Sequence, residues 1–260
     1  MAQTNKVVVV GAAGKMGLAV CAAVREDPEL ELVGTVDKPG VNVEWFGDRG
    51  LKIQSDLKAV LDETVADVVV DFTRAEAVLE NAQICLNAGA HAVVGTTGMS
   101  TTDIDTLVSL TEKTGRNIIV APNFALGAVI MMKMGERISK YFDRAEIVEY
   151  HHDEKADAPS GTSILTAEMI AKNLQADPLD EVEKYTGARG ATVKGIPVHS
   201  VRLPGYVAHQ EIMFGLKGQV LSIRHDSIDR SSFMPGVVMA VKEVGARSGF
   251  TYGLDKLLDI

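Results

Sequence analysis

The sequence has little cysteine and no excess of positive charge, and each shortage argues against a class of protein. Its two cysteines, Cys21 and Cys85, lie in apolar, helix-like surroundings (LAVCAAV and NAQICLNAG). We therefore expect buried thiols rather than a disulfide scaffold or a reactive thiol, which fits a reducing compartment. The net charge of −9 argues against a nucleic-acid partner, although a local basic patch could still bind a small anion.

Long apolar runs are missing as well. The first one, Val7–Val10, is short and leads into a glycine motif, so the N-terminal residues do not predict a signal peptide. No stretch approaches the roughly 18 consecutive apolar residues of a membrane span. We expect a soluble, cytoplasmic protein with no membrane partner.

The first 120 or so residues alternate between short apolar runs and segments with helical periodicity. The expected strands are 6–10, 30–36, 66–72, 91–98 and 117–124, and the expected helices are 16–26, 55–62, 75–89 and 101–114. Ser55 is the expected N-cap of the second helix. This alternation predicts an α/β fold with a doubly wound parallel sheet and helices on both faces.

The pattern changes near residue 125, which we take as a domain boundary. A helix (127–142), a strand (144–152) and a helix (161–174) precede a segment rich in Pro, Gly and charge (176–197), expected to be loop. Three runs, 198–203, 207–215 and 220–227, then alternate like strands of an antiparallel sheet, and a final helix is expected at 231–247. The second part is therefore predicted to be a smaller α+β domain.

A glycine-rich segment, GAAGKMG (residues 11–17), joins the first strand to the first helix. Its G-x-x-G-x-x-G spacing departs from the strict dinucleotide fingerprint, but its strand–turn–helix context is right. Asp37 stands at the end of the second strand, where a carboxylate holds a ribose hydroxyl. Lys38 could meet a 2′-phosphate, so NAD and NADP both stay open, as does the alternative that Lys38 is a solvated loop residue.

Two further loops, GTTG (95–98) and APNF (121–124), follow expected strands of the same sheet. In doubly wound sheets, ligands bind at the carboxyl ends of the strands. Thr96, Thr97 and Asn123 supply short hydrogen-bonding side chains there. Ordinary turn chemistry is the equally weighted alternative.

The most unusual stretch is EYHHDEKADAPSGTSI, residues 149–164. Pro159 excludes a regular helix before Ser160, which becomes a natural N-cap, and the free N–H groups of the next turn make an anion site. His151 and Lys155 add exchangeable protons beside it, so a carboxylate-bearing substrate fits. Surface or packing roles for the two histidines remain the alternative. A metal site is not expected, because the spacing of His151, His152, Glu154 and Asp157 matches no familiar one.

Taken together, the motifs VVGAAGKMG, DFT (71–73), VVGTTG, APNFALGAV and EYHHDEKADAPSGTS resemble those of the 4-hydroxy-tetrahydrodipicolinate reductase (dihydrodipicolinate reductase) family. The resemblance covers essentially the whole chain, and the HH-x-x-K-x-D-x-P-S-G-T block is its most specific part. It implies an oxidoreductase of diaminopimelate and lysine biosynthesis that uses NADH and/or NADPH.

The resemblance also assigns roles to residues. His151 corresponds to the catalytic acid/base and Lys155 to the proton donor. Substrate contacts fall on His152, Ser160, Gly161 and Thr162. Cofactor contacts fall on Gly11, Ala12, Ala13, Gly14, Lys15, Met16, Gly17, Asp37, Lys38, Gly95, Thr96, Thr97, Ala121, Pro122, Asn123 and Phe124.

The same resemblance implies a Rossmann-like domain at 1–126, completed by residues 236–260, and a substrate-binding and tetramerisation domain at 127–235. It further implies a homotetramer and two domains that close on the ligands. Two other functions remain as alternatives. One is a different NAD(P)-dependent dehydrogenase, such as one acting on an amino-acid semialdehyde. The other is a non-catalytic dinucleotide-binding regulator, which would not need His151 and Lys155 together.

Overall fold

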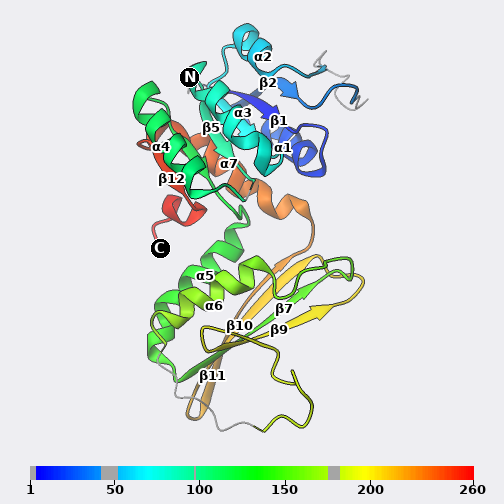
Figure 1. Cartoon of the computed structure of the whole chain (residues 1–260), viewed down its shortest axis with the longest axis vertical. Coiled ribbons are helices and arrows are strands. Elements are labelled where there is room, and N and C mark those ends of the chain that lie inside the picture. The colour runs from blue at the N-terminus through cyan, green and yellow to red at the C-terminus, as the bar shows by residue number, and fades with distance from the viewer. Residues whose placement is uncertain (1–3, 42–51, 97, 175–181) are drawn as a thin grey trace. The chain divides into compact units, whose positions relative to one another are not determined.

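The computed structural model describes residues 4–41, 52–96, 98–174 and 182–260 (Figure 1). These residues form two compact units. The first takes the chain up to Phe124 together with Phe233–Asp259, and the second takes Ala125–Ser232 with the terminal Ile260. Each unit is described by itself.

The first unit is built on a seven-stranded sheet in the order β12-β6-β5-β4-β1-β2-β3, and all its pairings are parallel. The order reverses between β1 and β4, which is the switch point at which doubly wound sheets bind ligands. Its strands are β1 (Asn5–Val10), β2 (Leu30–Val36), β3 (Ile53–Gln54), β4 (Val68–Asp71), β5 (His91–Val94), β6 (Ile118–Val120) and β12 (Phe250–Tyr252). Its helices are α1 (Lys15–Glu26), α2 (Leu57–Thr64), α3 (Ala75–Asn87), α4 (Thr101–Thr114) and α7 (Met234–Glu243).

The core of this sheet is buried on both sides. All four valines of Val7–Val10 are at most 4% exposed, and successive side chains of a strand point to opposite faces. Val8 and Val10 belong to a cluster with side chains of α2, α3 and α4. Helix α1 contacts α7. The predicted parallel sheet with flanking helices is therefore confirmed.

The C-terminal segment joins this unit through polar contacts as well as packing. The Asn117 side-chain amide donates to the carbonyls of Val244 (2.9 Å) and Gly245 (3.2 Å), and its carbonyl accepts from the Gly249 N–H (3.1 Å). The Lys242 ammonium pairs with Asp27 at 2.9 Å. In the same segment β12 pairs with β6 as a further parallel strand, where the sequence pattern predicts no strand.

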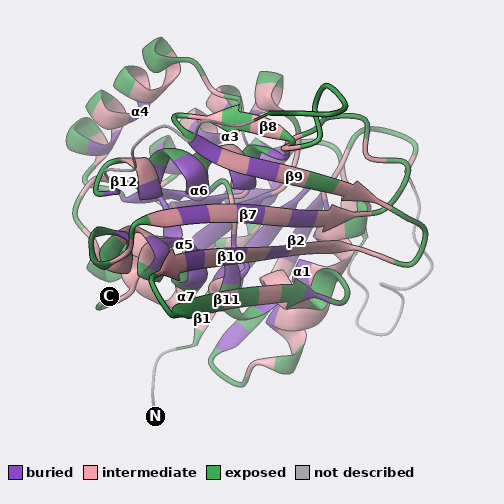
Figure 2. Ribbon diagram, turned by 90° about the horizontal axis from the view of Figure 1, so that it is seen from below, coloured by how far each residue is buried: buried purple, intermediate pink, exposed green. Residues whose placement is uncertain are grey.

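The second unit is a five-stranded sheet in the order β11-β10-β7-β9-β8, with α5 and α6 packed on one face (Figures 1 and 2). The strands are β7 (Arg144–His151), β8 (Ala191–Val193), β9 (Ile196–Arg202), β10 (Ala208–Leu216) and β11 (Gln219–Ser227), and the helices are α5 (Leu126–Ile138) and α6 (Gly161–Ala171). Its core includes Met131, Ile147, Ile170 and Phe214. Among the described residues, no helix combines the length and apolarity needed to cross a membrane.

Several local predictions need correction. The second sheet is mixed rather than antiparallel, because β7 and β9 run parallel. Part of the expected loop 176–197 is strand β8, while residues 176–181 lie outside the described chain. Lys194 and Gly195 both adopt positive φ, as a two-residue hairpin turn of type I′ requires. The N-cap of α2 is Asp56, whose side chain accepts from the Ala59 N–H at 3.0 Å, and not Ser55.

Candidate active site

The glycine loop lies at the switch point of the first sheet, and crowding explains two of its glycines. Gly11 has φ +77, and a β-carbon there would lie 3.0 Å from the Phe72 carbonyl oxygen. At Gly17, inside α1, a β-carbon would lie 2.0 Å from the Gly11 carbonyl oxygen. Gly14 is the N-cap of α1. The loop is therefore folded tightly against the sheet, and α1 begins directly over it.

This loop borders a cavity of about 980 Å³, which is of the size that proteins use for small-molecule cofactors. Gly11, Ala13, Gly14, Asp37 and Lys38 all line it. The Asp37 carboxylate accepts from the N–H groups of Ala13 and Lys38, both at 2.8 Å, so it is fixed at the end of β2 with further lone pairs to offer. A glycine floor, a helix N-terminus and a fixed carboxylate fit the phosphates and ribose of a dinucleotide.

Residues that the sequence analysis does not assign to the site also line this cavity. They are Phe72, Thr73 and Arg74, which follow β4, and Asn81 of α3. Buried Asp71 organises them, since its carboxylate accepts from the Thr73 N–H (2.7 Å), the Thr73 hydroxyl (2.6 Å) and the Asn81 amide (2.8 Å). The DFT motif (71–73) is the sequence signal that could have found Phe72 and Thr73.

The other predicted cofactor residues that the structure describes do not line the large cavity. A β-carbon at Gly95 would lie 2.1 Å from the Phe72 ring, so glycine is required there by packing. The Thr96 hydroxyl donates to the Thr73 carbonyl at 3.1 Å, and Thr96 and Pro122 line a separate cavity of about 30 Å³. The remaining positions divide by exposure. Ala12, Ala121 and Phe124 are buried, Met16 and Asn123 are half-buried, Lys15 is exposed, and Thr97 lies outside the described residues.

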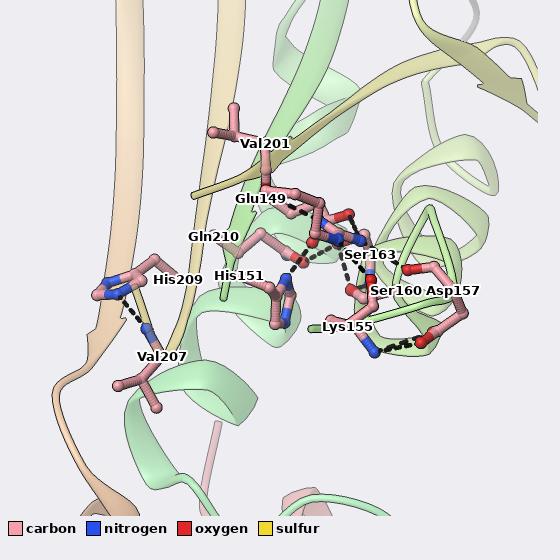
Figure 3. Close-up of polar contacts among 11 residues, drawn as sticks. Glu149, His151, Lys155, Asp157, Ser160, Ser163, Val201, Val207, His209 and Gln210 are labelled. Atoms are coloured by element: carbon pink, nitrogen blue, oxygen red, sulfur yellow. Dashed lines mark hydrogen bonds and ion pairs between the residues drawn. The ribbon is translucent and has the colours of Figure 1, made fainter. Parts of the chain in front are cut away.

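In the second unit, the end of β7 carries a buried carboxylate beside the predicted acid/base. Glu149 is 0% exposed; its Oε1 accepts from Arg202 Nη2 at 2.8 Å, and its Oε2 forms an ion pair with His151 Nδ1 (Figure 3). Burial would raise the pKa of Glu149, but hydrogen bonds from His151, Arg202 and Ser200 outweigh it and lower the pKa to about 2. The carboxylate is therefore an anion at neutral pH.

Lys155 lies in the turn that follows. Its ammonium donates to both carboxylate oxygens of Asp157, at 2.7 and 2.9 Å, and its side chain is 23% exposed (Figure 3). The hydrogen bond from Lys155 lowers the pKa of Asp157. The Lys155 N–H also donates to the His152 carbonyl at 3.2 Å, while the His152 side chain is exposed. Asp157 thus orders this turn.

The start of α6 is held by a chain of buried hydroxyl and amide groups. The Ser160 hydroxyl accepts from the Ser163 N–H at 3.2 Å, which confirms the predicted cap. The Ser163 hydroxyl in turn donates to the side-chain oxygen Oε1 of Gln210 (2.8 Å), and Nε2 of the same side chain donates to the Thr166 hydroxyl (2.9 Å). The first turn of α6 is therefore fixed to β10, a contribution that sequence reading missed.

Gly161, the first residue of α6, lies beside open space. A β-carbon there would meet nothing within 4 Å. The N–H groups at the start of a helix have no intrahelical partners, and the Ser160 hydroxyl takes only that of Ser163, so an anion can approach those of Gly161 and Thr162. No group of three or more metal-ligating side chains is found among the residues that the structure describes.

A Rossmann-like unit with a glycine loop, joined to a unit with a histidine, a lysine and a helix N-terminus, defines the class of dinucleotide-dependent oxidoreductases. Family models identify the member of that class. “Dihydrodipicolinate reductase, N-terminus” matches residues 5–124, and “Dihydrodipicolinate reductase, C-terminus” matches residues 127–258. The chain belongs to the dihydrodipicolinate reductase family.

Individual relatives agree with this assignment. Proteins named 4-hydroxy-tetrahydrodipicolinate reductase are 46% identical in Moorella thermoacetica, over 100% of both chains, and 45% identical in Bacillus subtilis, over 99% of each. Among solved structures, a dipicolinate-bound dihydrodipicolinate reductase from Paenisporosarcina sp. TG-14 has a TM-score of 0.90 and 38% identity, covering 98% of this chain and 100% of that chain. GenD2 from gentamicin A biosynthesis, at 16% identity and a TM-score of 0.66, covers 99% of this chain and 91% of its own and shares the fold alone.

Proposed function

We propose that this chain reduces 4-hydroxy-tetrahydrodipicolinate to tetrahydrodipicolinate with NADH or NADPH, in diaminopimelate and lysine biosynthesis. The observation that carries the proposal is the grouping of His151, Lys155 and the N-terminus of α6 on one unit of a chain that belongs to this reductase family. A nicotinamide cofactor, when bound, supplies the hydride. The chain must bind the dicarboxylate and supply a proton.

Each group of the second unit has a defined task in this proposal. The Gly161 and Thr162 N–H groups and the exposed His152 bind a substrate carboxylate, with the Ser160 cap holding the turn in place. Lys155 donates the proton, since an ammonium has three donors and can keep Asp157 while it reaches a substrate atom. His151 acts as the acid/base of the reaction.

For the cofactor, we propose that the cavity of the first unit receives the adenosine and phosphate part. Gly11, Ala13 and Gly14 would lie along the pyrophosphate, Asp37 would accept from the ribose, and Lys38 would contact the 2′-phosphate of NADPH. The positions 95–97 and 121–124 stay proposed contacts of the nicotinamide end.

We also propose a homotetramer that assembles through the face of the second sheet opposite α5 and α6. Among the described residues of the second unit, no helix covers this face (Figure 2), and it carries Val148, Tyr150 and Met213. Val220 is 73% exposed on its edge strand β11. Light scattering should show tetramers for the wild type and smaller species for Val220→Glu. Val65→Glu, which changes a valine that is 75% exposed in the first unit, is the matched control. A monomeric wild type would overturn this proposal.

The activity is tested by the absorbance of NADH and NADPH while the preceding synthase generates the substrate from pyruvate and aspartate semialdehyde. We expect cofactor oxidation that depends on the synthase. Lys155→Ala should lose roughly 10²- to 10⁴-fold in kcat, with a smaller change in KM. Folded wild-type protein that binds NADH but never oxidises it would favour a regulator, and turnover of another substrate in a screen would favour a different dehydrogenase.

A further inference from the structure

The loop that carries Lys155 and the strand that carries His151 share one arginine. Arg202 ends β9 and pairs directly with His151 in the parallel register of β7 and β9. Its guanidinium donates to the Lys155 carbonyl (Nε, 3.3 Å) and to the Asp157 carbonyl (Nη2, 2.7 Å). The same group donates to Glu149 at 2.8 Å. One side chain thus fixes the turn at two points and fastens it to the sheet.

Glu149 connects Arg202 to His151. An anion removed from water is costly unless it is paired, and here one oxygen faces Arg202 while the other faces His151. Glu149 and His151 are two residues apart on one strand, so their side chains share a face. Figure 3 shows the Glu149–His151 contact beside the Lys155–Asp157 pair.

The carboxylate also decides where the imidazole holds its proton. The hydrogen bonds that lower the pKa of Glu149 to about 2 keep it ionised, and an ionised carboxylate is only an acceptor. The ring nitrogen that faces it, Nδ1, must therefore carry a hydrogen. Nε2 is then the nitrogen through which a proton enters or leaves the ring.

We propose that Glu149 and Arg202 are positioning residues of the reaction: Glu149 sets the tautomer and orientation of His151, and Arg202 holds the turn that presents Lys155. This inference rests on the proposed function. It goes beyond that function because neither residue is placed against substrate or cofactor, and both act through groups that are.

The first test is Glu149→Gln, which keeps the shape of the side chain but removes its charge. An amide can donate to or accept from Nδ1, so the tautomer is no longer fixed. We expect kcat to fall roughly 10- to 100-fold, as a part of what general acid–base catalysis contributes, with the substrate KM within roughly twofold. The kcat–pH profile should also change shape, because a neutral amide replaces the anion that faces the ring.

A double-mutant cycle separates positioning from mere stability. If Glu149 acts through His151, Glu149→Gln should lower kcat by less than about twofold in a His151→Gln background. If Glu149 only stabilises the fold, its effect should be the same in both backgrounds, and the pH profile should keep its shape. Rates are taken per folded protein, with the melting temperature recorded for each variant.

A matched control is available on the same strand. Glu146 also contacts an arginine and a histidine, Arg189 and His199, but on the opposite face of β7. Glu146→Gln should keep the wild-type kcat and pH profile at an equal oligomeric state, checked by light scattering. Should Glu149→Gln not fold, Arg202→Lys, at a position whose side chain is 18% exposed, carries the test by keeping the charge without the forked donors.

We expect Arg202→Lys to lose roughly 10-fold in kcat with little change in KM, since a displaced Lys155 affects proton transfer more than binding. Folded Glu149→Gln or Arg202→Lys protein with wild-type kcat and pH profile would overturn the proposal, as would full additivity in the cycle. An inactive wild type would instead overturn the proposed function, so the two failures are distinguishable.

Discussion

A β-carbon added to Gly17 in the first unit would lie 2.0 Å from a carbonyl oxygen, whereas one added to Gly161 in the second unit would meet nothing within 4 Å. The two units differ in their buried carboxylates as well. Asp71 is held by the hydroxyl, amide and backbone donors of Thr73 and Asn81, and Glu149 is held by Arg202 and His151. The first unit, the packed side, is therefore built by close packing, with neutral donors around its buried carboxylate. The second unit, the charged side, is built by charged partners around its buried carboxylate and has open space beside α6.

The largest expected effect is a loss of folding stability when a methyl group is added at Gly17 in the first unit. Gly17→Ala forces a methyl group against the backbone of Gly11, which cannot move without displacing the loop, so we expect a loss of about 3 kcal/mol or more. Thermal unfolding followed by circular dichroism measures it. Gly245→Ala, whose β-carbon would come no nearer than 3.9 Å to His91, is the control in the same unit. Equal melting temperatures for the two variants would contradict the packing argument.

The stability that Glu149 contributes in the second unit should depend on pH. Because the folded pKa of Glu149, about 2, lies below its ordinary value of 4.5, its ionisation stabilises the fold fully above pH 4.5, and this contribution is lost as the pH falls towards 2. Its size is on the order of 3 kcal/mol. Urea unfolding at pH 7 and pH 3 should show a gap between wild type and Glu149→Gln that narrows at the lower pH. A gap of the same size at both pH values would contradict the assigned ionisation.

The two units also differ in how much of them the sequence could predict. Strand and helix order in the first unit follows from apolar periodicity, and the cap at Ser160 follows from local chemistry, so both were accessible. The glycine spacing pointed to the loop, but not to the reason for Gly95, because Phe72 meets it only after β4 and β5 pair.

The features that the sequence did not predict depend on contacts between distant residues or are very short elements. A three-residue strand such as β12 has too little periodicity to detect, and β8 is revealed only by the turn at Lys194 and Gly195. Glu149 stood inside the motif that marked the site, but its partner Arg202 is 53 residues away. Sequence reading could therefore name His151 and Lys155 without seeing what holds them.

A smaller effect, on substrate binding, is expected when a methyl group is added at Gly161. Gly161→Ala should leave the melting temperature unchanged or slightly higher, because alanine favours helix and nothing stands in its way. The methyl group would occupy the space through which a carboxylate approaches the N–H groups, so the substrate KM should rise roughly 10-fold with little change in kcat. Steady-state kinetics measures this. An unchanged KM would mean that the substrate carboxylate binds elsewhere.

The smallest expected effect is on the KM for NADPH when the exposed Lys38 of the first unit is replaced. Lys38 lines the large cavity next to Asp37 but is exposed to solvent, so a charge pair with a 2′-phosphate is worth only about 1 kcal/mol. Lys38→Ala should therefore raise the KM for NADPH by roughly fivefold and leave that for NADH within roughly twofold. Lys58→Ala, which removes an exposed lysine paired with Asp62 on α2, is the control for the loss of one positive charge. Unchanged KM values for both cofactors would show that Lys38 is a solvated loop residue. The choice between NADH and NADPH would then rest with Arg74, the other cation lining the described part of that cavity.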